Sequence, residues 1–160
     1  MRILAVDPGP TESAAVLFDT ETRRVVEHAK VLNEVMLTNI EIARSCYDVA
    51  VIEMIASYGI PVGAEVFETC VWIGRFLQVI GEQYTHRIFR KDVKLELCHK
   101  VQGVNDGVIR QRLIDLFGGK EKAIGKKKTP GPLYGISGDC WAALAVAIAW
   151  EMQHNKHAGP

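Results

Sequence analysis

Apolar runs of strand length, separated by polar turns, fill the first fifth of the chain. Residues 2–6 are almost all apolar and predict a strand buried on both faces of a sheet. The turn Asp7-Pro8-Gly9-Pro10 ends that strand abruptly. Residues 13–18 and 24–32 predict two further strands joined by a polar turn, so we expect the chain to open with a three-stranded meander.

Longer segments with apolar residues at helical spacing follow, with two more strands among them. We predict strands over residues 49–52 and 84–89, and helices over residues 34–45, 64–80, 91–98, 106–117 and 139–152. The apolar residues expected to face inward from three of these helices are Val66, Cys70, Ile73, Leu77 and Ile80; Val108, Leu113 and Phe117; and Trp141, Leu144, Ile148 and Met152.

This order of elements predicts a single α/β domain over residues 1–160, with a mixed five-stranded sheet and helices on both faces. Residues 118–137 combine lysines with Gly and Pro, so we expect no regular structure there and a basic loop that is mobile without nucleic acid. The chain lacks the ~18 uninterrupted apolar residues of a membrane-spanning helix, which favours a cytoplasmic protein without a membrane partner.

The cysteines argue against a disulfide frame or a zinc site. They lie far apart and form no C-x-x-C pair, which predicts reduced, buried, structural thiols in a cytoplasmic setting. The residues concerned are Cys46, Cys70, Cys98 and Cys140.

Charge is segregated along the chain although the net charge is zero. Residues 1–83 carry 6 Lys and Arg against 12 Asp and Glu, a balance of −6. Residues 84–130 carry 12 against 5, a balance of +7, and residues 131–160 carry 1 against 2. An acidic part that can hold cations followed by a basic part that can hold phosphates suits a metal-dependent nuclease.

Two acidic residues stand directly after buried strands, Asp7 after residues 2–6 and Glu53 after residues 49–52. If those strands are parallel neighbours, both carboxylates lie at the same edge of the sheet. Carboxylates placed side by side in a buried position need protons, basic partners or cations. Mg²⁺ prefers such oxygen ligands, and a pair of these ions can support in-line displacement at phosphorus.

Each acidic residue also has a purely structural interpretation. Asp7 could organise the turn that follows it, and Glu53 could pair with a buried arginine. Asp139 stands where the last helix begins, so it could cap that helix, with Ser137 as the competing cap.

Three segments together resemble the RuvC family of Holliday junction resolvases, and more closely its phage-encoded members. Ile-Leu-Ala-Val-Asp-Pro-Gly-Pro is similar to the family's first strand with its aspartate at Asp7, and Val-Ala-Val-Ile-Glu to the strand that carries its glutamate at Glu53. The segment from Ser137 to Ala147 resembles the helix that closes the family's active site. The resemblance spans nearly the whole chain, and it is the order and spacing of the motifs that make it specific.

The resemblance implies a ribonuclease H-like fold, a homodimer, and cleavage of four-way and other branched DNA. It implies two Mg²⁺ ions per active site, replaceable by Mn²⁺, with Asp7, Glu53 and Asp139 as ligands. We expect the helix over residues 64–80 to form the dimer contact. A departure concerns Ala142, because the bacterial enzymes usually carry a second metal-binding side chain three residues after the position of Asp139.

The family also uses lysines near the phosphate that is cut. Lys94 fits the first such place, and an exposed helix lysine is the alternative. Where the second is expected the chain has Asn105-Asp106-Gly107-Val108, so Arg110 or Arg112 would have to substitute, unless each is a solvated helix residue.

Basic and aromatic residues outside that site are candidates for DNA binding. Tyr58 resembles in placement the aromatic residue that the family inserts at the junction crossover, with ordinary packing as the alternative. The basic loop suits phosphate contacts without base readout through Lys120, Lys122, Lys126, Lys127 and Lys128.

Other functions remain open on the sequence alone. Within the nucleases, a ribonuclease H or a flap-type enzyme would share the fold and the metal site. The missing partner at Ala142 also permits a non-catalytic protein that binds branched DNA. Sugar kinases and actin-like ATPases begin with a similar strand, but they clasp a nucleotide between two such domains, so we expect no nucleotide cofactor here.

Overall fold

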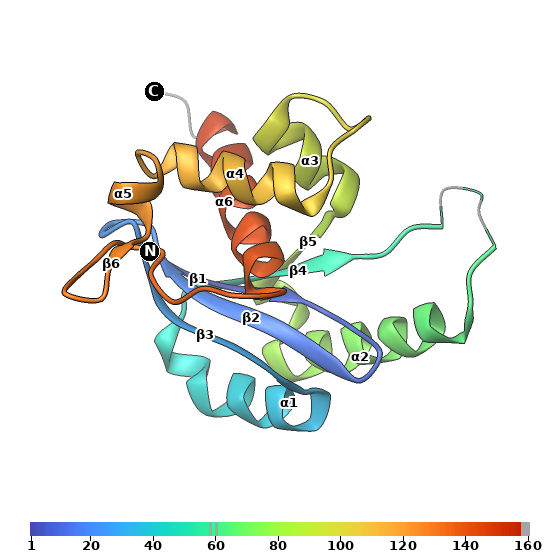
Figure 1. Cartoon of the computed structure of the whole chain (residues 1–160). Coiled ribbons are helices and arrows are strands. Elements are labelled where there is room, and N and C mark those ends of the chain that lie inside the picture. The colour runs from blue at the N-terminus through green and yellow to red at the C-terminus, as the bar shows by residue number, and fades with distance from the viewer. Residues whose placement is uncertain (58, 60, 158–160) are drawn as a thin grey trace.

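A five-stranded mixed sheet with strand order β3-β2-β1-β4-β5 forms the centre of the computed structural model (Figure 1). The structure describes residues 1–57, 59 and 61–157. β1 is antiparallel to β2, and β2 to β3, whereas β1 is parallel to β4, and β4 to β5. The strands of the sheet are β1 (Arg2–Asp7), β2 (Glu12–Asp19), β3 (Arg24–Leu32), β4 (Val49–Met54) and β5 (Thr85–Phe89).

Helices cover both faces of the sheet, as predicted (Figure 1). They are α1 (Asn33–Ile42), α2 (Ala64–Ile80), α3 (Arg90–Cys98), α4 (Asp106–Leu116), α5 (Lys120–Ala123) and α6 (Cys140–His157), with 3₁₀ turns η1 (Ala43–Cys46) and η2 (Glu82–Tyr84). Alternate residues of β1 serve different cores: Ile3 and Ala5 pack with α6, whereas Leu4 and Val6 pack toward α1 and α2. The strand is therefore buried on both faces. No described helix is long and apolar enough to cross a membrane.

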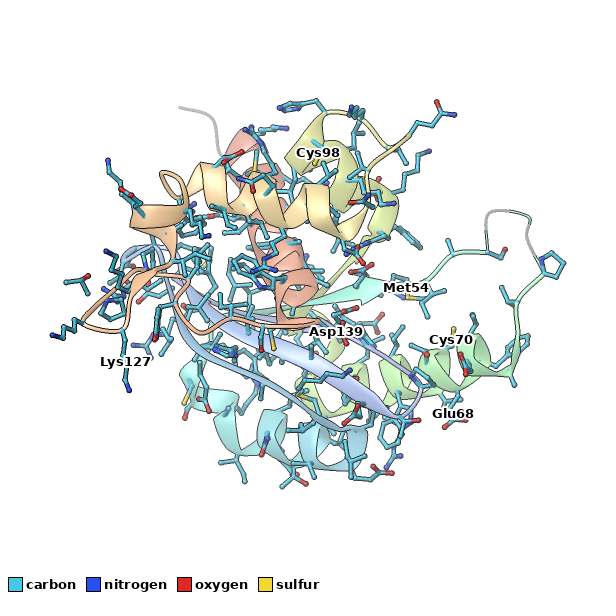
Figure 2. All side chains as sticks on the ribbon, in the orientation of Figure 1. Met54, Glu68, Cys70, Cys98, Lys127 and Asp139 are labelled. Carbon is cyan, nitrogen blue, oxygen red and sulfur yellow. The ribbon has the colours of Figure 1, made fainter. Side chains whose placement is uncertain are left out.

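The stripe predicted for α2 is correct in part, because Ile73 and Ile80 are buried. The helix also buries Trp72 and Phe76, and Cys70 is exposed instead (Figure 2). Two large aromatic rings remove more apolar surface from water than the smaller side chains of the predicted stripe, which explains their burial. Cys46 is exposed as well, so the prediction of buried cysteines is wrong for these two residues and holds for Cys140.

The predictions for α4 and α6 also need correction. α4 buries Ile109, Leu113 and Ile114, while Val108 is exposed. α6 is buried around most of its circumference from Cys140 to Glu151, because it lies between the sheet and the pair α3 and α4 (Figure 1). Its alanines permit this close packing on several sides, which a single predicted stripe did not anticipate.

Regular structure exists within residues 118–137, contrary to the sequence-based prediction. This segment contains α5 and a two-stranded hairpin of β6 (Gly125–Lys126) and β7 (Thr129–Pro130). Gly125 has φ +70°, and a Cβ atom there would lie 2.3 Å from the Thr129 carbonyl oxygen, so the tight turn requires glycine. Ala123, Leu133 and Ile136 are buried and anchor the segment to the core, which the Lys, Gly and Pro content concealed.

Candidate active site

Asp7 and Glu53 lie together at the edge of the sheet where parallel strands β1 and β4 end. The register pairs Val6 with Ile52, and the next residue of each strand is the acidic one. Both carboxylates follow the strand alternation onto the face covered by α6. The predicted juxtaposition of two carboxylates at one edge is therefore present.

The turn after Asp7 is fixed by other residues. Asn33, which is fully buried, accepts a hydrogen bond from Ser13 Oγ at 2.6 Å and donates to the Gly9 carbonyl at 2.9 Å. A Cβ atom on Gly9 would lie 2.4 Å from the Glu12 carbonyl oxygen, so the turn also needs glycine there. Among the described residues, none donates a hydrogen bond to the Asp7 carboxylate. This carboxylate is thus not the organiser of its turn, and sequence analysis missed Ser13 and Asn33.

Burial raises the pKa of both strand-end carboxyl groups, and at Asp7 the charge of Glu53 adds to this effect. Burial raises the pKa of Asp7 to about 7, with the charge of Glu53 as the next cause and Asp139 as a smaller one. Burial also raises the pKa of Glu53, while the neighbouring Arg90 acts in the opposite direction. The site therefore attracts positive charge.

Arg90 is the basic residue that contacts this pair. It is the first residue of α3, and its Nη1 lies 3.3 Å from Glu53 Oε2. Its Nη2 forms a second ion pair with Asp106 at the start of α4. The alternative interpretation of Glu53, pairing with an arginine, is therefore realised here. The fold places Arg90 there because β5 is parallel to β4 and Arg90 follows β5 directly.

Asp139 approaches the same edge from the turn that precedes α6, but a different cation holds it. Its Oδ2 lies 2.8 Å from Lys30 Nζ, and Lys30 also lies 3.6 Å from Glu12. The first N–H groups of α6 donate to backbone carbonyls. The Cys140 N–H donates to the Ser137 carbonyl, and the N–H groups of Ala142 and Ala143 donate to the Asp139 carbonyl. The Asp139 side chain is more than half exposed, so it can change partners more easily than Glu53.

Lys94 lies one turn after Arg90 on α3 and is half-buried. Its positive charge is among the influences that lower the pKa of Glu53, which places it near that carboxylate. Where a second lysine was expected, Asn105 caps α4 by accepting a hydrogen bond from the Val108 N–H at 3.0 Å. That position therefore has a structural use in this chain.

The two arginines of α4 have different surroundings. Arg110 is exposed, and its guanidinium lies 4.9 Å from the ring centre of Trp141, in the first turn of α6. Arg112 is half-buried, and its Nε donates to the Leu97 carbonyl at 2.9 Å, which ties α4 to the end of α3. Arg110 is thus the one whose guanidinium faces a residue close in sequence to Asp139.

The predicted DNA-binding lysines lie at the other end of the sheet from the carboxylates. The Val25 N–H donates to the Pro132 carbonyl, and Val25 is in register with Phe18, which pairs with Ile3 near the start of β1. In Figure 2, Lys127 accordingly lies on the opposite side of the molecule from Met54, at the end of β4. All five side chains are exposed, namely Lys120, Lys122, Lys126, Lys127 and Lys128. Tyr58 lies outside the described residues.

The donors at the carboxylate edge fit a hard divalent ion such as Mg²⁺. Asp7 and Glu53 offer carboxylate oxygens in a buried position, and Asp7 receives no hydrogen bond from the described residues. Within the described part of the chain, no three His, Cys, Asp or Glu side chains lie close enough together to hold an ion. Mg²⁺ typically uses one or two carboxylates and completes its shell with water and substrate phosphate, so the pair is sufficient in kind.

Comparison with known structures shows the fold. The chain is similar to Thermus thermophilus RuvC, with a TM-score of 0.71 and 15% identity over 98% of this chain and 97% of that one. It is also similar to T. thermophilus RuvC in complex with a Holliday junction substrate, with a TM-score of 0.69 and 14% identity over 98% and 96%. No protein-family model and no curated protein matches the sequence. The ribonuclease H-like fold predicted from the sequence is confirmed.

Proposed function

We propose that this chain is a metal-dependent endonuclease that cuts four-way and other branched DNA. The observation that carries the proposal is the pair Asp7 and Glu53, buried side by side at the ends of parallel strands with raised pKa values. Buried carboxylates without sufficient internal donors are expensive to ionise, and a site for cations explains their presence. The fold shared with a structure solved in complex with a Holliday junction supports branched DNA as the substrate.

Asp7 and Glu53 would hold Mg²⁺, or Mn²⁺ in its place, and Asp139 would join them once its carboxylate exchanges Lys30 for the ion. Bound there, such ions supply an activated water and charge stabilisation for displacement at phosphorus. The chain itself supplies the carboxylate charge, a half-buried lysine at position 94 near the phosphate, and the buried packing around both strands that holds the carboxylates in place. Because Ala142 provides no ligand, Asp139 is the sole protein ligand that α6 and its preceding turn would contribute.

DNA would extend from the carboxylate edge toward the hairpin of β6 and β7. This basic hairpin carries Lys126, Lys127 and Lys128. Asp7 and Arg2 are separated by five residues of strand, roughly 17 Å at ~3.3 Å per residue. This distance corresponds to about five base pairs along a duplex arm, at ~3.4 Å per nucleotide of one strand. Arg110, on α4, lies beside Trp141 in the first turn of α6. From α4 the chain continues through α5 to the hairpin. Phosphate contacts by exposed lysines would fix the arm without reading its sequence.

We also propose a homodimer that forms through α2. Phe67 is 63% exposed and Val71 is 56% exposed, and these residues lie one helical turn apart on the same side of α2. Two adjacent apolar side chains exposed on a long helix favour contact with a protein surface. A dimer would place two active sites on one junction. We propose that it acts in the cytoplasm of a bacterium or of a phage-infected cell.

The test is a cleavage assay on four matched substrates. Purified protein is incubated with a synthetic four-way junction, a duplex of the same sequence, a flap and an RNA-DNA hybrid, in Mg²⁺ or in EDTA. We expect Mg²⁺-dependent, symmetric nicks in the junction that disappear in Glu53→Gln. Glu41→Gln, a substitution at an exposed position of α1, away from the carboxylate edge and from the proposed dimer helix, is the control for loss of a carboxylate.

The same assay separates the alternative functions. Preferred cutting of the hybrid or of the flap would identify a ribonuclease H or a flap-type nuclease. Tight binding of the junction without a cut in Mg²⁺ or Mn²⁺ would contradict the proposal of an enzyme and would leave a protein that binds branched DNA.

A further inference from the structure

We propose that Arg90 competes with the divalent ion for Glu53 and gives way to a DNA phosphate, so that metal and DNA bind cooperatively. This inference rests on the proposed function, and it concerns how the same site is regulated. The observation behind it is that Arg90 links the buried carboxylate of the site to an exposed carboxylate outside it.

The side chain of Arg90 spans the boundary between the buried site and the solvent. Glu53 is 12% exposed, Arg90 is 25% exposed and Asp106 is 86% exposed. One end of the guanidinium contacts the site at Glu53 Oε2, and the other contacts Asp106 at the first turn of α4. Arg90 therefore acts as the internal counter-ion of the carboxylate pair.

Arg90 and a metal ion oppose each other at Glu53. A guanidinium stays protonated at every accessible pH, so Arg90 cannot become neutral to make room for a second cation. A carboxylate oxygen that accepts a hydrogen bond from Arg90 is less available as a ligand, and two cations near one carboxylate repel each other. An ion that binds Glu53 must therefore displace Arg90 or bind more weakly.

A phosphate is the partner that can release Arg90. The planar fork of an arginine matches the oxygens of phosphate as well as those of a carboxylate. Because Asp106 is largely exposed, a phosphate that reaches this side of the site can take over the outer end of the fork. When DNA supplies this anion, Glu53 loses its competitor and becomes free to bind the metal.

The pair formed by Lys30 and Asp139 provides a contrast within the same site. Lys30 is 44% exposed and Asp139 is 56% exposed, so water and salt weaken this contact. Exchange of Lys30 for a metal ion should cost little. Arg90, which is more buried than Lys30 and contacts a more buried carboxylate, is thus the residue expected to control metal binding.

The experiment is a calorimetric titration of DNA-free protein with Mn²⁺. Wild type, Arg90→Gln and Lys91→Gln are compared. Lys91 is exposed on the same turn of α3, and its loss removes the same charge without removing an ion pair to Glu53. We expect Arg90→Gln to bind Mn²⁺ roughly tenfold more tightly than wild type, within the usual range of coupling between two sites. Lys91→Gln should stay within about twofold, because its charge is exposed and screened.

A second measurement tests the coupling to DNA. Junction affinity is determined in EDTA and in Ca²⁺, with the DNA checked to be uncut. The gain in affinity on adding Ca²⁺ should be smaller in Arg90→Gln than in wild type, because the internal competitor is absent. If Arg90→Gln is poorly folded in EDTA, circular dichroism and Tm in Mn²⁺ replace the titration, and recovery of the native signal is the expected result.

Equal or weaker Mn²⁺ binding by Arg90→Gln, or failure of Mn²⁺ to restore its fold, would overturn the inference. That outcome is distinct from failure of the proposed function, which is judged by nicking of the four-way junction by wild type. A protein that cuts junctions but shows no change in metal affinity in Arg90→Gln would leave the nuclease and exclude this role of Arg90.

Discussion

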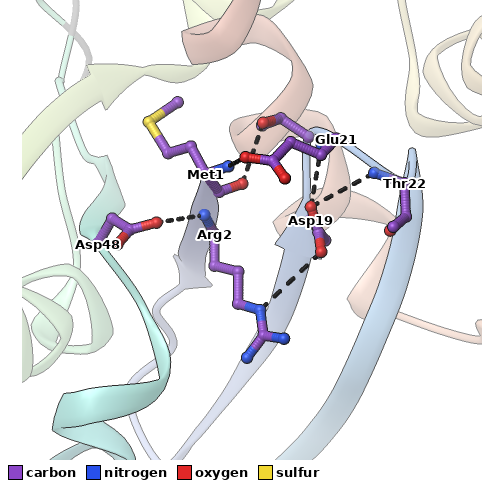
Figure 3. A network of polar contacts seen from close by, with 7 residues as sticks. Met1, Arg2, Asp19, Glu21, Thr22 and Asp48 are labelled. Carbon is purple, nitrogen blue, oxygen red and sulfur yellow. Dashed lines mark hydrogen bonds and ion pairs between the residues drawn. The ribbon is translucent and has the colours of Figure 1, made fainter.

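The two ends of the central sheet both gather carboxylates, with opposite electrostatic results. At the amino end of β1, Asp48 accepts a hydrogen bond from the Arg2 N–H at 2.7 Å, and Glu21 lies 2.9 Å from the terminal amine (Figure 3). Asp19 accepts hydrogen bonds from two backbone N–H groups, those of Glu21 and Thr22. These bonds lower the pKa of Asp19, with the bond from Glu21 as the largest cause.

At the carboxyl end of β1, the carboxylates receive far fewer hydrogen bonds. Asp7 has no hydrogen-bond donor among the described residues, and burial raises its pKa to about 7. Glu53 has one arginine, which does not outweigh burial. The acidic residues at the amino end are stabilised as carboxylates by hydrogen bonds and ion pairs within the fold. Those at the carboxyl end have too few donors and cations to offset their burial. This difference supports the cation site proposed at the carboxyl end.

The largest expected effect contrasts one carboxylate from each end. Asp7→Asn should reduce Mg²⁺-dependent nicking of a four-way junction on the order of 10²–10³-fold. Loss of one group that stabilises charge in a transition state reduces turnover on this scale. Asp48→Asn, at the amino end, should cut at the rate of wild type. Single-turnover kinetics on one junction measure both. A similar loss in both variants would show that the two ends do not differ in this way.

The second effect is a pH dependence of stability in EDTA. The pKa of Asp7 is about 7 in the folded protein, whereas its ordinary value, expected in the unfolded chain, is 3.8. Between these two pH values Asp7 is protonated in the folded protein and ionised in the unfolded chain. The free energy of unfolding should therefore decrease as pH rises from about 4 to about 7, by up to ~4 kcal/mol from this group, and then level off. Urea unfolding at pH 5 and pH 8 measures the decrease, which should be much smaller in Asp7→Asn. An equal decrease in Asp7→Asn would show that another group causes this pH dependence.

The third effect concerns the basic hairpin near the amino end. Replacing Lys126, Lys127 and Lys128 with Gln should weaken junction binding about tenfold or more at moderate salt and leave the metal affinity unchanged. The slope of log affinity against log salt should become shallower by up to ~2.7, at ~0.9 per lost phosphate contact. Fluorescence anisotropy over a salt series measures this. An unchanged slope would show that DNA does not reach this end of the sheet.

The smallest effect is expected from Asp19. Its lowered pKa stabilises the folded protein above the ordinary value of 3.8, and this contribution disappears as pH falls through the folded pKa. Asp19→Asn should therefore lower Tm slightly at pH 7, and the difference from wild type should vanish in acid. Because the group is exposed, the change should be much smaller than the effect of Asp7. Differential scanning calorimetry at pH 7 and pH 3 measures it.

The sequence determined the elements and the positions of the strand-end acids. The strands of the central sheet have five to nine residues and are ended by turns such as Asp7-Pro8-Gly9. These are local features, so the meander and the later strands could be predicted from residue order alone. The same locality placed Asp7 and Glu53 at strand ends. Their adjacency followed once β1 and β4 were parallel neighbours, as the structure has them.

The tertiary structure decided which partners these residues meet. Lys30 reaches the site from β3, and Arg90 reaches it from the start of α3, directly after β5 at the opposite edge of the sheet. No spacing along the chain announces either contact. Trp72 and Phe76 replaced part of the predicted stripe in the buried face of α2. Leu133 is buried and anchors a segment whose composition predicted no regular structure. Local pattern fixes where a strand or helix forms, because backbone geometry depends on near neighbours. Burial, charge pairing and the resulting pKa values depend on residues brought together across the fold, which is why those properties of the site were decided by the tertiary structure.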